Sequence, residues 1–183
     1  MREIVSTERL FLRQLIPDDV DALFEALGDP VSMRYYSAPF DRGRVVDWIE
    51  SARLSYRENG FGLWAVIRRS DGQFIGDCGP MLQPVEDQLI PEVGYHIVPT
   101  EQRRGYATEA AGACVAWVFA NTRFDVVCSL VAPENAPSRA VAAKVHSKMR
   151  EFTWAKKDKK MCLYWTSRPG DDPGGLATPV QGW

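Results

Sequence analysis

The segment from residue 92 to residue 131 constrains the fold more than any other part of the chain. It contains a strand-like run at 92–98 that Pro99 ends, an apolar-faced helical run at 107–121, and a β-branched run at 125–131. A strand, a helix and a strand in succession predict a right-handed crossover between two parallel strands. The sheet that holds this pair therefore cannot consist of hairpins alone.

Hairpin signals lie on either side of this crossover. Asp71-Gly72 separates strand-like runs at 63–68 and 73–78, and Asp-Gly between two such runs favours an antiparallel pair. Before it, Val20, Leu23, Phe24 and Leu27 recur at helical spacing, and Asp41 precedes a second helical stripe. The other predicted elements are a strand at 9–15, a helix at 138–148, and a last hairpin of 152–155 with 161–165 around the lysine-rich turn 156–160.

The predicted architecture is α+β, with a mixed, mostly antiparallel central sheet, helices on both faces, and the order β-α-α-β-β-β-α-β-α-β-β. A chain of 183 residues is long enough for one domain with its own core. We place that domain at residues 5–167. Residues 168–183 are rich in proline and glycine, so we expect a disordered tail there.

Composition excludes several classes of function. The net charge is −2, which gives no reason to expect nucleic acid as a partner. The start has no apolar signal-peptide region, and the longest apolar run is about half of a bilayer span, so we expect a cytoplasmic protein without a membrane partner. The four cysteines are widely spaced, with no CxxC and no paired histidines, which predicts reduced thiols and no metal site.

The segment Gln102-Arg103-Arg104-Gly105-Tyr106-Ala107-Thr108-Glu109-Ala110 carries the clearest chemical signal. It follows a strand and opens a helix, where backbone N–H groups have no partner within the helix. A glycine there lets a ligand approach the backbone, and the two arginines add positive charge for phosphate oxygens. The alternative is an ordinary strand-to-helix turn with solvated arginines.

That segment resembles the acetyl-coenzyme-A signature, Q/R-x-x-G-x-G/A, of the GNAT N-acyltransferases. Residues 135–144, with Asn135, Ser138 and Lys144, resemble the family's Asn-x-x-Ser…Lys segment. The opening Thr7-Glu8-Arg9-Leu10-Phe11-Leu12-Arg13 is similar to the first strand of the branch of ribosomal-protein alanine N-acetyltransferases. The resemblance spans about residues 6 to 167.

The resemblance implies acetyl-CoA as co-substrate, with no metal. Its pantetheine arm would lie in a slot where the strands at 92–98 and 126–131 splay apart, and its pyrophosphate on the helix start. Asn135 would hold the pantetheine amides, although it is equally suited to cap the following helix. The implied cofactor-binding residues are Ile97, Val98, Arg103, Arg104, Gly105, Tyr106, Ala107, Thr108 and Asn135.

The implied reaction is direct acetyl transfer to an amine, which needs a base and an acid. Ser138 is the candidate acid, because it matches the serine of the family's Asn-x-x-Ser segment, and Ala142 stands where many relatives carry a tyrosine. Glu92 is the first candidate base and His96 the second, since both lie on one face of their strand. A base acting through water stays open.

Acceptor recognition is assigned to the loop between the first two helices and to the last hairpin. This nominates Tyr35 and Tyr36, with Trp64 or Trp154 as further candidates that suit a core equally well. The chain departs from the family after Lys144, where His146 and Ser147 replace the usual glycine and phenylalanine. The local register there is the least determined part of the prediction.

The sequence thus predicts a GNAT-type N-acetyltransferase whose acceptor is a primary amine. A protein N-terminus is the first acceptor class, and a small-molecule amine of the antibiotic or polyamine type is the second. A coenzyme-A-binding module without transfer activity is the alternative outside the enzymes. Both a monomer and a homodimer fit the composition.

Overall fold

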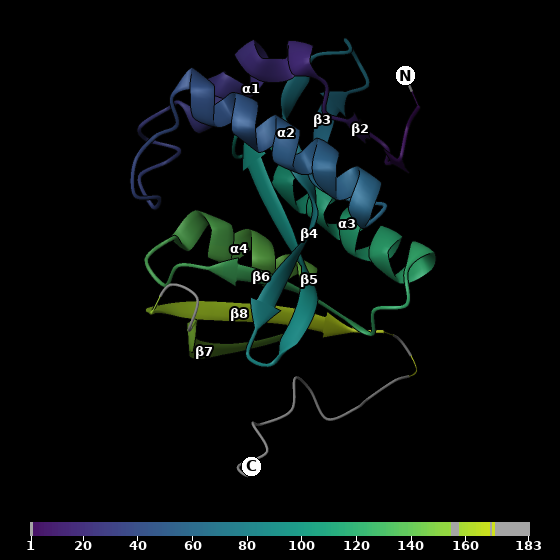
Figure 1. Cartoon of the computed structure of the whole chain (residues 1–183), viewed down its shortest axis with the longest axis vertical. Helices are drawn as coiled ribbons and strands as arrows, with labels where there is room; N and C mark the ends of the chain where they lie inside the picture. The colour runs from purple at the N-terminus through teal and green to yellow at the C-terminus, as the bar shows by residue number, and fades with distance from the viewer. Residues whose placement is uncertain (1, 155–157, 169, 171–183) are drawn as a thin grey trace.

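The computed structural model describes residues 2–154, 158–168 and 170. Within them the strands form one eight-stranded sheet in the order β1-β2-β3-β4-β5-β6-β8-β7 (Figure 1). The elements are β1 Val5–Ser6, β2 Leu10–Gln14, η1 Pro17–Asp19, α1 Val20–Leu27, α2 Arg42–Glu58, β3 Trp64–Arg68, β4 Phe74–Val85, β5 Gln88–Ile97, η2 Pro99–Glu101, α3 Tyr106–Asn121, β6 Val126–Val131, α4 Ala136–Val145, β7 Lys148–Trp154 and β8 Lys159–Ser167.

The predicted α+β architecture and element order are confirmed, with the two-residue β1 added at the edge. Only β5 and β6 pair in parallel among the described strands; the other neighbours are antiparallel. Helix α3 makes the crossover between them, as the strand–helix–strand pattern predicts. Asp41 caps α2 by accepting a hydrogen bond from the backbone N–H of Arg44 at 2.8 Å.

The side chains of residues 63–67, in and just before β3, alternate between the two faces of the sheet, and helices pack on both faces. Leu63, Ala65 and Ile67 pack with the buried residues of α1 and α2, whereas Trp64 and Val66 pack with those of α3. Successive side chains of a strand point to opposite faces, so one short run contributes to two cores. In Figure 1, α1 and α2 lie together on one side of the sheet and α4 lies beside β6.

Four element boundaries differ from the prediction by three residues or more. Strand β4 continues to Val85 and β5 begins at Gln88, so these strands form one long hairpin through the turn at Glu86 and Asp87. The sequence hid it because prolines lie within both strands, at Pro80, Pro84 and Pro91. Helix α4 ends at Val145 instead of residue 148, and β7 begins at Lys148 instead of residue 152. Residues 155–157 of the last turn lie outside the described residues.

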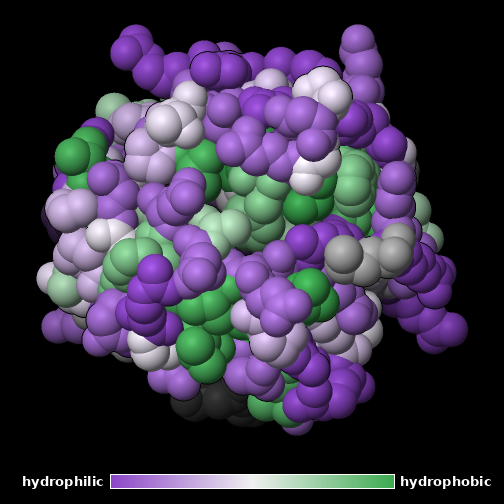
Figure 2. Space-filling view, turned by 90° about the horizontal axis from the view of Figure 1, so that it is seen from above, coloured by the Kyte–Doolittle hydropathy of each residue, from purple (hydrophilic) through white to green (hydrophobic). Residues whose placement is uncertain are grey.

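The described surface is largely polar. Figure 2 shows polar residues over most of one face, with apolar residues gathered between them. No helix in the described part is long and apolar enough to cross a membrane. The predicted tail lies outside the described residues except for Arg168 and Gly170. Arg168 donates hydrogen bonds to the carbonyls of Phe119, Thr122 and Phe124, and so closes the end of α3.

The early end of α4 has a specific cause, which is the burial of His146. This side chain is 7% exposed. Its Nε2 lies 3.0 Å from the Ser129 hydroxyl of β6, and its Nδ1 lies 3.3 Å from the Thr166 hydroxyl of β8. An extended residue at this point carries the chain from the helix into β7 without the glycine that the family pattern has.

Stability should therefore depend on pH through His146. Burial lowers the pKa of His146 to about 4, whereas an unfolded histidine titrates near 6.5. The unfolded state binds the extra proton first, so the stabilisation is complete above pH 6.5 and is lost as the pH falls towards 4. The loss amounts to about 3 kcal/mol.

Urea unfolding of the wild type and of His146→Gln at pH 7, 5.5 and 4.5 checks this prediction. The wild type should lose more free energy of unfolding than the variant over this range, because the variant has no proton to bind. Equal losses in the two proteins would contradict it.

Candidate functional site

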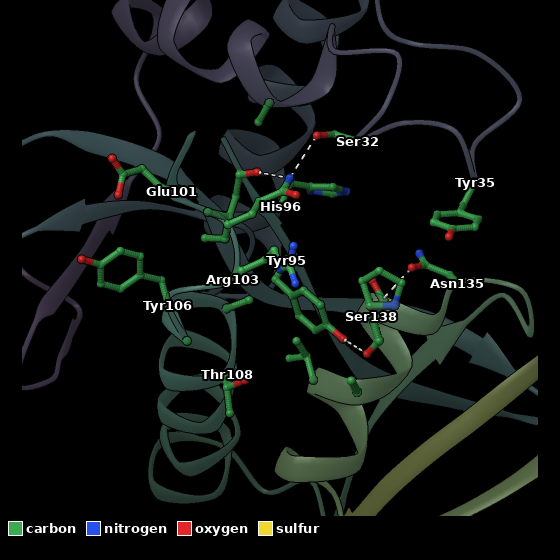
Figure 3. A pocket seen from close by; sticks show the side chains of 18 of the residues that line it. Ser32, Tyr35, Tyr95, His96, Glu101, Arg103, Tyr106, Thr108, Asn135 and Ser138 are labelled. Atoms are coloured by element: carbon green, nitrogen blue, oxygen red, sulfur yellow. Dashed lines mark hydrogen bonds between the residues drawn. The ribbon is translucent and has the colours of Figure 1, made fainter. Parts of the chain in front are cut away.

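A cavity of about 790 Å³ lies between the start of α3, the start of α4, the end of β5 and the loop after α1. Figure 3 shows Tyr106 and Thr108 on one side of it, Asn135 and Ser138 on the other, and Tyr95 between them. This volume is typical of ligand-binding pockets. The end of β5 at Ile97 and the start of α4 at Ala136 lie far apart in the sequence, so the site is built from segments that the fold brings together.

The cavity opens where β5 and β6 separate. Their ladder has one register pair, Glu92 opposite Cys128. Beyond it, side chains take over the backbone hydrogen bonds: the Ser129 hydroxyl donates to the Val93 carbonyl at 2.8 Å, and the Leu130 N–H donates to Glu92 Oε1 at 3.3 Å. Because unpaired buried backbone groups are costly, these two bonds stabilise the separated strands.

The start of α3 has the geometry of an anion-binding site. Gly105 is the N-cap residue, with φ of 84° and no side-chain capping bond. Arg103 also has a positive φ, of 63°. Left-handed residues before a helix turn successive N–H groups towards one side, and the uncapped first turn adds its own. Ala107 and Thr108 line the cavity beside them.

The turn between β1 and β2 stabilises this helix start. Thr7 Oγ1 donates to Glu109 Oε1 at 2.6 Å, and the Arg9 guanidinium pairs with the same carboxylate at 2.6 Å. Arg9 also donates to the Arg104 carbonyl at 3.0 Å and lies 4.6 Å above the Tyr106 ring. Residues 7–13, which are similar to the family's first strand, thus make contacts that hold the anion-binding start of α3, called the cradle below, in place.

On the other side of the cavity, Asn135 caps α4. Its Oδ1 accepts from the Ser138 N–H at 3.2 Å, as the capping alternative predicted, and Pro137 lies in the first turn. The Tyr95 hydroxyl donates to the Ser138 carbonyl at 2.8 Å and ties β5 to α4 (Figure 3). Burial raises the pKa of Tyr95, so its phenol stays protonated.

A chain of polar groups reaches the cavity from the core. His96 Nδ1 lies 2.8 Å from Asp77 Oδ1, and His96 Nε2 lies 2.7 Å from the Tyr36 hydroxyl. Trp48 Nε1 donates to the other oxygen of Asp77 at 2.9 Å. Burial lowers the pKa of His96, but the charges of Tyr36 and Asp77 and the hydrogen bonds to them outweigh burial and raise it to about 10.

A family model described as "Acetyltransferase (GNAT) domain" matches residues 9–148. The chain belongs to the GNAT acetyltransferase family. The protein YkkB of Bacillus subtilis is 34% identical over 140 residues, which cover 76% of this chain and 81% of YkkB. A crystal structure of an acetyltransferase from Agrobacterium tumefaciens has a TM-score of 0.78 and 24% identity, covering 90% of this chain and 94% of that one.

Two ligand-bound structures share the fold. RimL, a ribosomal L7/L12 α-N-protein acetyltransferase in complex with coenzyme A, has a TM-score of 0.72 and 15% identity, covering 93% of this chain and 100% of that one. AAC(6')-Ib in complex with ribostamycin and coenzyme A has a TM-score of 0.70 and 14% identity, covering 88% of this chain and 94% of that one. Proteins of this fold therefore act on quite different acceptors.

The structure of this GNAT protein brings most of the predicted site residues to one cavity. The residues that both line it and were nominated from the sequence are Tyr35, Tyr36, His96, Ile97, Arg103, Gly105, Tyr106, Ala107, Thr108, Asn135 and Ser138. Trp64 is 1% exposed in the core, and Trp154 donates to the Pro84 carbonyl. The core alternative is confirmed for Trp64.

Three nominated residues lie elsewhere. The Val98 N–H donates to the Ile75 carbonyl at 3.0 Å. The Arg104 guanidinium lies 3.2 Å from Glu101. Glu92 receives the Leu130 N–H between the separated strands and does not line the cavity among the described residues. Their predicted roles in binding and catalysis remain predictions.

Sequence reasoning missed Asp77, Trp48 and Tyr95. Asp77 was visible as a carboxylate inside an apolar strand, and it is 0% exposed. A buried charge needs a partner, which is a signal that the sequence contained. Its partners, Trp48 of α2 and His96 of β5, come from other elements, and no spacing rule could identify them. In the described part of the chain, no group of three or more histidine, cysteine or acidic side chains is placed to hold a metal ion.

Gly105→Glu should abolish acetyl-CoA binding. The variant places a carboxylate at a helix start that suits phosphate, on a residue whose φ of 84° disfavours any side chain. Gly60→Glu is the matched control, since Gly60 has a φ of 79° with nothing near its added Cβ and lies outside the cavity.

Calorimetric titration of the three proteins with acetyl-CoA measures the effect. We expect wild-type affinity in Gly60→Glu and no detectable heat of binding in Gly105→Glu. Equal affinities in both variants would remove the cradle from the binding site.

Proposed function

We propose that this chain transfers the acetyl group of acetyl-CoA directly to a primary amine. The observation that carries the proposal is the layout of the cavity. One end has the uncapped, glycine-containing helix start of α3, and the other has His96 with a buried carboxylate behind it. A diphosphate group at one end and a proton-accepting group at the other are the two requirements of this reaction.

Different residues along the cavity would bind acetyl-CoA and transfer protons. Arg103 to Thr108 would bind the pyrophosphate, and Asn135 and the edge of β5 at Ile97 would align the pantetheine arm. Bound there, acetyl-CoA supplies an activated thioester. Ser138, in the first turn of α4, would give a proton to the departing thiolate, and a backbone N–H of β5 would polarise the thioester carbonyl.

Between the two candidate bases we propose His96. It lines the cavity, and Asp77 holds its ring through Nδ1. The carboxylate of Glu92 instead receives a backbone N–H of β6. Such a bond stabilises the strand separation, and Glu92 is not among the described residues that line the cavity.

The charges around the cavity favour an acceptor with a single amine. Arg34, Arg103 and Lys144 line it, and Glu101 is the one lining carboxylate among the described residues. Glu101 is already held by Arg68 at 2.6 Å. A polycation would find no unpaired carboxylate here, although the net charge of −2 by itself would attract it. A peptide N-terminus is therefore our first acceptor class, and polyamines or aminoglycosides the second.

We further propose a cytoplasmic location, as a monomer or homodimer. The four cysteines are free and buried, which suits a reducing compartment. The arrangement also supports coenzyme-A binding without transfer, and the experiment below separates that function from an enzyme.

The test is a thiol-release assay with acetyl-CoA and three acceptor sets: peptides with N-terminal alanine or serine, spermine, and kanamycin. We expect turnover with the peptides and little with the two polycations. Turnover restricted to the polycations would move the acceptor class to small molecules. Acetyl-CoA binding without release of thiol in any set would favour the binding module.

His96→Gln and Glu92→Gln form a matched pair that tests the base. Both replace a candidate proton acceptor by a neutral amide. We expect kcat to fall about 10²-fold or more in His96→Gln, the usual contribution of a general base. In Glu92→Gln the amide oxygen can still accept the Leu130 N–H, so kcat should stay within a few-fold of wild type.

Both variants should bind acetyl-CoA with wild-type affinity by calorimetry. The reverse pattern, with activity lost in Glu92→Gln and kept in His96→Gln, would restore Glu92 as the base.

A further inference from the structure

Four polar side chains from four separate segments form one continuous chain: Trp48 of α2, Asp77 of β4, His96 of β5 and Tyr36 of the loop after α1. The three links measure 2.9, 2.8 and 2.7 Å. Exposure rises along it, because Asp77 is fully buried, the His96 side chain is 14% exposed and Tyr36 is 42% exposed. The chain thus ends at the cavity with a phenol and not with the imidazole.

The positions of the protons follow from the chemistry of the groups. A carboxylate only accepts, and Asp77 receives the Trp48 N–H at one oxygen and the His96 Nδ1–H at the other. His96 Nε2 is then the nitrogen that exchanges a proton with the Tyr36 oxygen. An amine in the cavity meets the Tyr36 oxygen first, because that oxygen occupies the one ring nitrogen of His96 that faces outwards.

Rings around the chain hold it in place. Tyr36 and Trp48 both contact the Phe40 ring edge-on, at 6.3 and 5.6 Å between centroids, and Trp48 meets the His96 ring in the same way at 5.9 Å. The loop itself is tied down by the Gln102 side chain, which donates to Ser32 at 3.0 Å (Figure 3). Tyr36 is therefore positioned by packing as well as by its hydrogen bond.

We propose that Tyr36 is the catalytic residue that receives the proton of the acceptor ammonium, with His96 as its proton partner and Asp77 as a positioning residue. The proposal deepens the proposed function and rests on it. In the form of the site that accepts the proton, one proton is shared between Tyr36 Oη and His96 Nε2. After transfer each atom carries a proton, and Asp77 balances the charge of the imidazolium.

The protons balance over the reaction. The ammonium gives its first proton to the Tyr36–His96 pair, and the free amine forms the C–N bond with the acetyl carbon. The C–S bond breaks, and the second proton of the nitrogen goes to the thiolate through Ser138. The pair returns its proton to solvent, so acetyl-CoA and an ammonium give an amide, coenzyme A and one proton.

Electrostatics supports this arrangement. The groups that face His96 are Asp77 from β4, Tyr36 from the loop, and the neutral Trp48 ring from α2. Although burial lowers the pKa of His96, its electrostatic interactions and hydrogen bonds with Tyr36 and Asp77 raise it to about 10. The ammonium of a peptide N-terminus has a pKa of about 8, so proton transfer from it to this pair is favourable in energy. The two groups titrate as a coupled pair.

The first test is the pH dependence of Tyr36→Phe, with the best peptide acceptor of the assay above. We expect kcat to fall about 10²-fold at pH 7, with wild-type acetyl-CoA affinity. The defect should shrink as the pH rises through the pKa of the acceptor amine, which then arrives without its proton. Tyr164→Phe is the control, because Tyr164 is buried, holds Arg139 and lies outside the cavity.

A defect of the same size at every pH would show a merely structural role and overturn the proposal, as would wild-type activity in Tyr36→Phe. Asp77→Asn separates positioning from catalysis. Its amide would donate to Nδ1 and force the proton onto Nε2, so kcat should fall at least as far while KM for the peptide stays unchanged.

The second test needs no acceptor. The chain has two histidines, so imidazole ¹H–¹⁵N spectra report on His96 with His146 as an internal reference. We expect a proton on Nδ1 of His96 in the wild type and on Nε2 in Asp77→Asn. In Tyr36→Phe the titration of His96 should move to lower pH, with His146 unchanged.

An unshifted His96 titration in Tyr36→Phe would overturn the relay whatever the activity. Absence of acetyl-CoA binding by the wild type would instead overturn the proposed function, and the two failures are therefore distinct.

Discussion

The separation of β5 from β6 is the constraint on which the rest of the structure depends. A continuous parallel ladder would close the cavity, and an open one would leave backbone groups without partners. The chain resolves this with two side chains: Glu92 takes the Leu130 N–H, and Ser129 donates to the Val93 carbonyl. Ser129 is held in turn by His146, whose burial ends α4 and starts β7. The strand separation is thus linked, through Ser129 and His146, to the boundary between α4 and β7.

The two ends of the cavity are stabilised in different ways. At the α3 end, an ion pair between Arg9 and Glu109 and a hydrogen bond from Thr7 to Glu109 stabilise the helix start. The first N–H groups of the helix have no side-chain cap and so are available to a ligand. At the other end, a buried carboxylate anchors His96 through one nitrogen and a phenol occupies the other. Phosphate binding needs fixed dipoles, whereas proton transfer needs groups that change charge. The proposed function assigns phosphate binding to the α3 end and proton transfer to the His96 end.

Much of the fold could be predicted because its signals are local. Pro99, the Asp71-Gly72 turn and the apolar stripe of 107–121 each mark an element through short-range sterics or periodicity. The long β4–β5 hairpin escaped prediction because prolines lie within it, and the tertiary pairing of the strands overrides their local preference. The boundary at Val145 escaped because a buried histidine, not a glycine, ends the helix.

The sequence by itself determined the order of the elements, the crossover and the position of the α3 start, and it predicted an anion-binding site there, because Gly105 and the arginines beside it are neighbours in the chain. It also nominated Glu92 and His96 together, since residues four apart on a strand share a face. Only the tertiary structure determined which of these two side chains lines the cavity and what surrounds each of them. Pairing with β6 takes up Glu92, and packing of α2 and the loop brings Asp77, Trp48 and Tyr36 to His96. Contacts between residues up to 60 positions apart depend on how layers stack, which no local pattern encodes.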